Sequence, residues 1–241
     1  KVIVADKSGK LPLDLSTVVN PLTGKADITT FYKYGETFNA MFGEISNSYE
    51  ECRAESVGIY LSTFDHILKI FGHEGAEATD IMYINWLLMV RAGLLGLEFY
   101  NPDSNKWLQA HMRARFCILN VLLEAGEDFV QIVEEENNCY VTLDKSKILT
   151  VGMRAMETFL LKLGIYKSTC NLVDGVAMYH KYTEVNDRML KLRKIVLEKK
   201  QPRKVFVQPL TVEDGAEIKL QEFEASYDGM IQCFSKITKL L

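Results

Sequence analysis

The chain has 241 residues, of which 48% are hydrophobic, and its formal net charge is −4. This length and apolar content allow a substantial core in one large or two small domains. The basic residues are dispersed in a slightly acidic chain, so we expect no nucleic-acid-binding surface. The five cysteines lie far apart and include no Cys-x-x-Cys pair. This pattern favours reduced thiols over a disulfide framework or a cysteine zinc site, and with them a cytoplasmic location.

The first 61 residues divide into an irregular part and a helical part. Residues 1–34 lack helical periodicity and contain turn-forming pairs, so we expect a surface segment with at most a short hairpin. Residues 36–61 are predicted to form one helix, because apolar or small residues recur every three or four positions. These positions are Phe38, Met41, Phe42, Ile45, Tyr49, Cys52, Ser56 and Ile59.

The later elements are predicted from apolar periodicity, alternation, capping residues, glycine and proline. In chain order they are a helix over 64–71 ending at Gly72, a core helix over 79–99, a helix over 105–125 with Ser104 as N-cap, a hairpin of 129–134 with 139–143, helices over 145–163, 171–182 and 184–200, strands at 205–208 and 217–221, and a helix over 224–241. The predicted fold class is therefore mainly α, with a small β-hairpin and a short C-terminal α+β segment.

One apolar run, from Ile81 to Leu97, is nearly long enough to cross a membrane. It carries Asn85 and Arg91 near its middle, and polar residues are costly inside a bilayer. We therefore predict a buried core helix at this position, and we expect no membrane partner.

Three carboxylates, Glu50, Glu51 and Glu55, fall within six residues of the first long helix. Glu51 and Glu55 are four positions apart, so they share a face and repel each other. One interpretation is a partly exposed acidic face with Arg53 as the local counter-ion. The other is a carboxylate cluster around a cation, in which Glu51 binds the metal and Glu50 and Glu55 orient other ligands. The spacing alone leaves both interpretations open.

The stretch Tyr49-Glu50-Glu51-Cys52-Arg53-Ala54-Glu55, continued by Ser56-Val57-Gly58-Ile59-Tyr60-Leu61, resembles the second signature of the dipeptidyl peptidase III family of zinc metallopeptidases. The resemblance continues through residues 81–126, fades over 129–142 and returns at 203–209. In that family an upstream His-Glu-x-x-Gly-His helix supplies two zinc ligands and a general base. The resemblance implies that Glu51 is the third zinc ligand.

Further site residues follow from the same resemblance. His111 and Arg115 are four apart and share a helix face, although a lone helical histidine is more often structural. The family match implies that His111 stabilises the oxyanion of the tetrahedral intermediate and that Arg115 holds a short peptide substrate. Arg203 and Lys204 match a basic pair that anchors the C-terminal side of the peptide. Without the resemblance they would be ordinary charge at a helix end.

One motif of the family, His-Glu-x-x-Gly-His, does not occur in the 241 residues. We therefore expect this chain to be the C-terminal portion of a parent enzyme, starting just after the zinc-binding helix. Residues 1–202 would form a helical zinc-binding lobe, and residues 203–241 would cross into a second lobe. With Zn²⁺ and the remainder of the parent enzyme, the chain would release N-terminal dipeptides from short peptides. The alternative is a non-catalytic helical scaffold or interaction module with the same fold.

Overall fold

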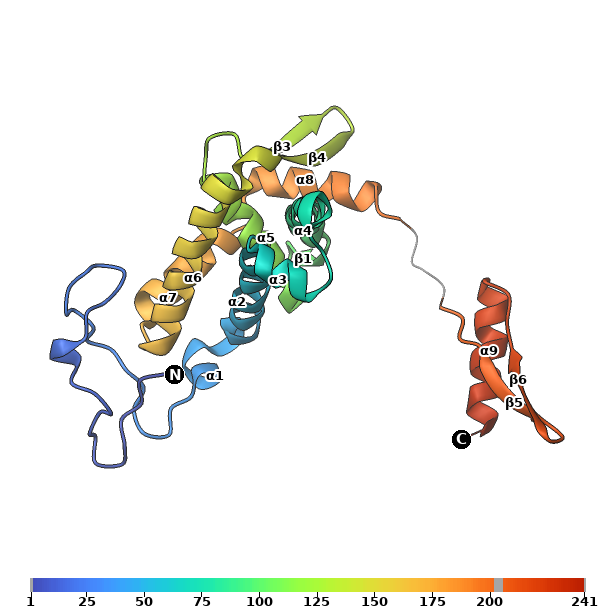
Figure 1. Cartoon of the computed structure of the whole chain (residues 1–241), viewed down its shortest axis with the longest axis horizontal. Helices are drawn as coiled ribbons and strands as arrows, with labels where there is room; N and C mark the ends of the chain where they lie inside the picture. The colour runs from blue at the N-terminus through green and yellow to red at the C-terminus, as the bar shows by residue number, and fades with distance from the viewer. Residues whose placement is uncertain (1, 202–205, 241) are drawn as a thin grey trace. The chain divides into compact units, whose positions relative to one another are not determined.

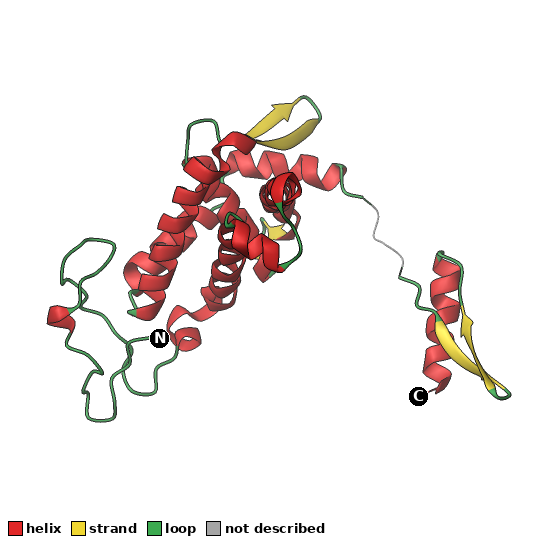
Figure 2. Cartoon of the chain, in the orientation of Figure 1, coloured by secondary structure: helices red, strands yellow, loops and turns green. Residues whose placement is uncertain are grey.

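The computed structural model of the chain describes residues 2–201 and 206–240. The chain divides into two compact units, Lys1–Lys199 and Lys200–Leu241. The mainly α prediction is confirmed, because strands in the described residues occur only as three two-stranded antiparallel pairs (Figure 2). The predicted boundary between residues 202 and 203 lies outside the described residues. The assignment of the second unit to another lobe stays a prediction.

The first unit is built mainly from helices (Figure 1). These are α1 (Phe38–Phe42), α2 (Ser46–Leu61), α3 (Asp65–Ile70), α4 (Gly75–Leu95), α5 (Ala110–Glu124), α6 (Met153–Ser168), α7 (Leu172–Thr183) and α8 (Asp187–Glu198). Short helical turns extend or connect them: η1 (Leu15–Thr17), η2 (Gly43–Ile45), η3 (Gly96–Phe99), η4 (Lys145–Lys147) and the π-helical η5 (Ile148–Gly152). Two strand pairs complete the unit: β1 (Tyr100–Asn101) with β2 (Lys106–Trp107), and β3 (Val130–Glu135) with β4 (Asn138–Leu143).

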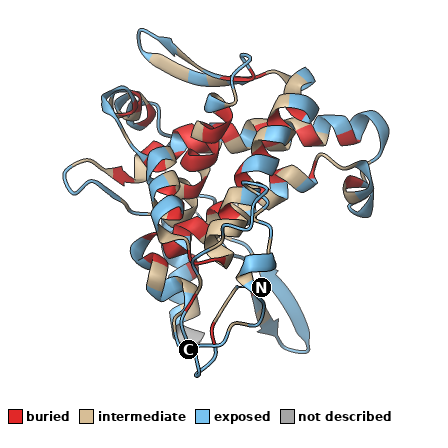
Figure 3. Cartoon of the chain, turned by 90° about the vertical axis from the view of Figure 1, so that its left-hand side faces the viewer, coloured by how far each residue is buried: buried red, intermediate tan, exposed pale blue. Residues whose placement is uncertain are grey.

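The core of the first unit lies between α2, α4 and α5, whose inward faces are buried (Figure 3). The predicted apolar stripe of α2 is confirmed, because Tyr49, Cys52, Ser56 and Ile59 are all buried. Trp86 of α4 is fully buried, and its Nε1 donates a hydrogen bond of 3.1 Å to the carbonyl oxygen of Ile59. A buried Trp N–H needs such an acceptor, so this bond fixes α4 against the C-terminal end of α2.

Two glycines let α4 and η3 approach α5 closely. A Cβ atom placed on Gly93 would lie 2.6 Å from the carbonyl oxygen of Arg115 and 2.6 Å from Cβ of Leu119. A Cβ atom on Gly96 would lie 2.9 Å from the carbonyl oxygen of Met112. The backbone of α5 therefore packs directly on these glycines.

Helix α4, together with η3, is long and apolar enough to cross a membrane by length and composition. Such a helix is also typical of a globular core. Its residues Met82, Trp86, Val90 and Leu94 are buried, and α4 packs against α5. The prediction that residues 81–97 belong to a core helix agrees with this packing.

The prediction of one continuous helix over residues 36–61 is wrong. Helix α1 ends at Phe42, and the chain passes through η2 before α2 begins at Ser46. Gly43 has φ +56°, a left-handed value that glycine adopts without steric cost. The apolar periodicity continues across the break, and so the sequence pattern concealed it.

The prediction of a helix over residues 105–125 is wrong in its first part. Residues 100–107 form the β1–β2 pair, in which Tyr100 lies opposite Trp107. The side chain of Asn101 accepts hydrogen bonds from the backbone N–H groups of Asp103 and Ser104, which stabilises the turn between the strands. Helix α5 starts at Ala110, and the side chain of Gln109, not Ser104, accepts the capping bond from the Met112 N–H.

The remaining predicted elements are present with shifted ends, except the strand at 205–208. Residues 2–34 are irregular apart from η1 and two isolated bridges, and the 129–143 hairpin is confirmed. The second unit contains an antiparallel pair, β5 (Leu210–Asp214) with β6 (Glu217–Gln221), followed by α9 (Tyr227–Leu240). Its predicted α+β content is confirmed. The prediction of a strand at 205–208 is wrong, because residues 206–208 are irregular and β5 begins at Leu210; residue 205 lies outside the described residues.

Candidate metal and peptide site

Two carboxylates project from one face of α2 toward α5. Glu51 and Glu55 are one helical turn apart, as their spacing predicted. The opposite side of α2 is fixed in the core, because the hydroxyl of Tyr49 donates a hydrogen bond of 3.0 Å to the carbonyl oxygen of Leu163 in α6. The side chain of Glu55 is 14% exposed and that of Glu51 is 33% exposed. The site therefore combines a nearly buried carboxylate with a more accessible one.

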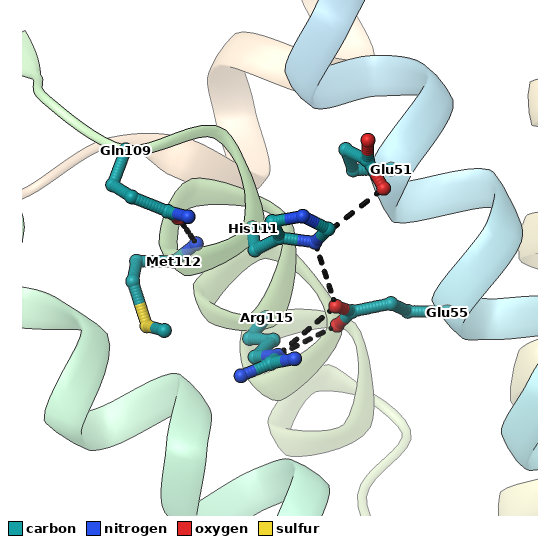
Figure 4. A network of polar contacts seen from close by, with 6 residues as sticks. All are labelled: Glu51, Glu55, Gln109, His111, Met112 and Arg115. Atoms are coloured by element: carbon teal, nitrogen blue, oxygen red, sulfur yellow. Dashed lines mark hydrogen bonds and ion pairs between the residues drawn. The ribbon is translucent and has the colours of Figure 1, made fainter. Parts of the chain in front are cut away.

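Helix α5 presents His111 and Arg115 to these carboxylates (Figure 4). Arg115 Nε donates to both oxygens of Glu55, at 2.8 and 3.1 Å. His111 Nδ1 lies 3.1 Å from Glu55 Oε1 and 3.4 Å from Glu51 Oε2. One carboxylate thus holds the two side chains that the sequence placed on a single helix face.

The contacts of His111 determine which ring nitrogen carries the proton. An ionised carboxylate can only accept hydrogen bonds, so His111 Nδ1 must donate to Glu55. Nε2 then has no hydrogen-bond partner within the described part of the chain. A carboxylate at Nδ1 fixes both the tautomer and the orientation of an imidazole. Glu55 is therefore placed to orient His111, and the Nε2 edge remains available to another group.

The carboxylate of Glu51 is the part of this cluster best suited to a cation. Glu55 is already neutralised by Arg115, whereas Glu51 makes no ion pair with a lysine or arginine anywhere in residues 2–201 or 206–240. Its contact with His111 is the longer of the two, at 3.4 Å. A half-buried carboxylate without a counter-ion favours the binding of a cation, because desolvation of the bare charge is costly.

Glu50 lies in a different ion-pair network. It contacts Arg53 on the same helix and Lys167 of α6. Partial burial alone would raise the pKa of Glu50, but hydrogen bonds from Arg53 and Lys167 outweigh burial and hold this pKa below its usual value. Arg53 is thus a local counter-ion, as the first interpretation of the acidic face expected. This counter-ion serves Glu50 and not the Glu51–Glu55 face.

A complete metal site is not present in the described residues, which contain no group of three histidine, cysteine, aspartate or glutamate side chains suitably close together. A zinc site normally uses at least three protein ligands. The oxygen donors of Glu51 fit one position of such a site, and two further ligands would have to come from elsewhere. The predicted peptide-binding residues Arg203 and Lys204 lie outside the described residues.

Comparison with known proteins shows which family this chain belongs to. The model of peptidase family M49 matches residues 1–237. The chain belongs to peptidase family M49. Over 97% of its length it is 50% identical to dipeptidyl peptidase 3 of Nematostella vectensis, and over 98% it is 49% identical to dipeptidyl peptidase 3 of Homo sapiens. In both cases the chain spans about a third of the relative's length, 33%.

A solved structure was also found, that of DPP III from Caldithrix abyssi. It matches 67% of this chain and 27% of its own length, with 17% identity and a TM-score of 0.48. Within this M49 chain, the sequence correctly paired Glu51 with Glu55 and His111 with Arg115. It did not predict that Glu55 bridges His111 and Arg115, because that contact joins residues 56 and 60 positions apart.

Proposed function

We propose that this chain is part of a zinc-dependent dipeptidyl peptidase that releases N-terminal dipeptides from short peptides. The observation that carries the proposal is the Glu51 carboxylate, which has no lysine or arginine partner among the described residues and lies 3.4 Å from His111 Nδ1. Membership of peptidase family M49 supports a peptidase, and the relatives named dipeptidyl peptidase 3 support the dipeptidyl specificity.

In this proposal Glu51 is one of three protein ligands of Zn²⁺. The other two would be histidines of the remainder of the parent enzyme, as the sequence resemblance implies. When bound, zinc polarises a carbonyl group and lowers the pKa of a bound water. Glu50 and Glu55 would then act through hydrogen bonds to neighbouring side chains. The contact of Glu55 with His111 supports such a role for Glu55.

His111 would act on the oxyanion of the tetrahedral intermediate. Glu55 holds Nδ1–H, so the ring would face the reacting group with Nε2. In the imidazolium form Nε2 would also carry a proton and could donate it to the negative charge. Arg115 would bind the peptide. Only its Nε contacts Glu55, and this leaves its terminal nitrogens for a peptide carbonyl or carboxylate.

Two further parts of the proposal rest on sequence. Arg203 and Lys204 would anchor the C-terminal side of the peptide, which their match to a basic pair of the family supports. The enzyme would be cytoplasmic. All five cysteines are free thiols, as is typical of proteins from reducing compartments.

The substitution His111→Asn tests the proposed mechanism in an enzyme that carries this chain together with the two upstream histidines. Loss of one oxyanion donor typically lowers kcat by about 10²–10³-fold. We expect this loss with zinc content and melting temperature unchanged, because the His111 side chain is 43% exposed and outside the core. His66→Asn is the matched control, since His66 is exposed and contacts neither carboxylate. A large fall in melting temperature with unchanged kcat per folded molecule would instead assign His111 a structural role.

A further inference from the structure

A second polar site lies on the side of α5 that faces away from His111 and Arg115. Arg113 is two residues from each of them, and two residues correspond to a rotation of about 200° around a helix. It lines a cavity of about 530 Å³ between the β1–β2 pair and the C-terminal part of α7. A smaller cavity of about 140 Å³ shares Glu44, Trp107 and Arg113 with the larger one. Arg113 therefore borders both cavities.

The positive charge of Arg113 is held in place without a carboxylate. Its Nε and Nη2 atoms lie 3.3 and 3.2 Å from the hydroxyl oxygen of Thr183, and its guanidinium carbon is 5.1 Å from the ring centre of Tyr179. No carboxylate among the described residues comes within ion-pairing distance of it. Burial lowers the pKa of Arg113, which reflects the cost of partly desolvating an unpaired cation. An anion in the cavity would remove that cost.

Two other polar side chains that line the cavity, His180 and Lys106, can donate hydrogen bonds to a ligand. Arginine cannot accept a hydrogen bond, so the contact of 3.4 Å between Arg113 Nη2 and His180 Nδ1 makes Nδ1 the acceptor. Burial and then the charge of Arg113 lower the pKa of His180. The neutral ring keeps its proton on Nε2 and can donate it. Lys106, which is exposed, adds a second cation at the cavity rim.

Two glutamates, Glu44 and Glu184, also line the cavity. Both residues are exposed, so water and salt screen their charges. Burial holds the pKa values of Arg113 and His180 below their usual range, although the charge of Glu44 acts to raise both. The wall beside Arg113 is rigid, because Trp107 Nε1 donates a hydrogen bond of 3.0 Å to the carbonyl oxygen of Thr183. The rings of Trp107 and Tyr100 pack at 5.4 Å and give this wall an aromatic surface.

From these contacts we propose that the cavity binds a small ligand bearing an oxyanion, either a carboxylate or a phosphate group. Arg113 anchors the oxyanion through its Nη1 N–H groups, which contact neither Thr183 nor His180. Lys106 adds attraction at the rim, and the aromatic wall covers the body of the ligand. This site uses none of the residues of the proposed peptidase mechanism.

Tryptophan fluorescence of the 241-residue chain tests this proposal. The chain has two tryptophans, of which Trp86 is fully buried and Trp107 lines the cavity. Inorganic phosphate and succinate are titrated separately at constant ionic strength, with chloride as the reference anion. We expect a saturable change in emission with at least one of the two probes and none with chloride. The preferred probe identifies the oxyanion.

Three variants locate the binding site. Arg113→Gln should raise the Kd of the preferred probe by about 10- to 100-fold, the range expected for charge-assisted hydrogen bonds. Lys106→Gln, at an exposed position, should raise it by about 2- to 5-fold. Lys10→Gln, in the irregular N-terminal segment, should leave it unchanged. If Arg113→Gln does not fold, the proposal is tested by the Kd of Lys106→Gln alone, which must rise. A response equal to that of chloride, or variants that all bind like the original chain, would overturn the proposal.

Discussion

The close packing of α4 on α5 makes Gly93→Ala the most informative single change for the fold around the site. The new Cβ atom would lie 2.6 Å from the carbonyl oxygen of Arg115 and from Cβ of Leu119. Neither atom can rotate away, because one is backbone and the other is fixed by the backbone. The two helices must therefore separate, and the movement reaches Arg115 itself.

Two opposing free energies set the size of the effect. Overpacking of a well-packed core costs about 1–3 kcal/mol, and contact with a rigid backbone places this change at about 3 kcal/mol. Replacing glycine by alanine inside a helix stabilises the helix by about 1 kcal/mol. We expect a net loss of about 2 kcal/mol in the free energy of unfolding. For a unit of this size that corresponds to a fall in Tm of about 4–8 °C.

Urea unfolding followed by tryptophan fluorescence measures this loss. Trp86 and Trp107 both belong to the first unit, so the signal reports on that unit alone. Gly164→Ala is the matched control, because Gly164 is also helical and a Cβ atom there would meet nothing within 4 Å. This control should be up to about 1 kcal/mol more stable than the original chain. If Gly93→Ala gained stability as Gly164→Ala does, the close contact between α4 and α5 would be refuted.

Two further predictions concern the core and the metal. Burial raises the pKa of Tyr49 in the folded chain. As the pH rises above about 10, Tyr49 ionises in the unfolded chain but not in the folded one, so the free energy of unfolding decreases. Tyr49→Phe should lower the free energy of unfolding by about 1 kcal/mol at neutral pH. Above about pH 10 the free energy of unfolding of this variant should fall less steeply with pH, by about 1.4 kcal/mol per pH unit. Urea unfolding between about pH 7 and 11 measures both effects. The 241-residue chain alone should bind zinc weakly and hydrolyse no dipeptidyl substrate, because its described residues bring no three metal ligands together. Stoichiometric zinc after mild chelation, or measurable turnover, would contradict this second prediction.

Much of the fold could be predicted because its signals are local. The buried stripe of α2 and the hairpin of residues 130–143 each depend on residues close together in the chain. The failures also have local causes. The apolar periodicity continues through Gly43, although its positive φ ends α1. The polar turn after Asn101 forms a small strand pair instead of starting a helix.

The site was predictable only within each helix. Spacing placed Glu51 with Glu55 and His111 with Arg115, but it could not show that Glu55 joins the two pairs. Glu50 illustrates the same limit. Its partner Lys167 is 117 residues away, so the sequence grouped Glu50 with its neighbours on α2 while tertiary packing joined it to α6. Arg113 gave no sequence signal, since its cavity forms only where α5, α7 and the β1–β2 pair meet.

Zinc content is the most direct test of the central claim that Glu51 binds the catalytic metal. The measurement compares Glu51→Gln with the unchanged enzyme, in a protein that carries this chain and the two histidine ligands proposed to come from the remainder of the parent enzyme. Glu77→Gln serves as control, because Glu77 is exposed and pairs only with His73 on the described surface. We predict that Glu51→Gln loses its zinc during purification and its dipeptidyl peptidase activity, whereas Glu77→Gln keeps both. Full zinc occupancy in Glu51→Gln by metal analysis would contradict the account.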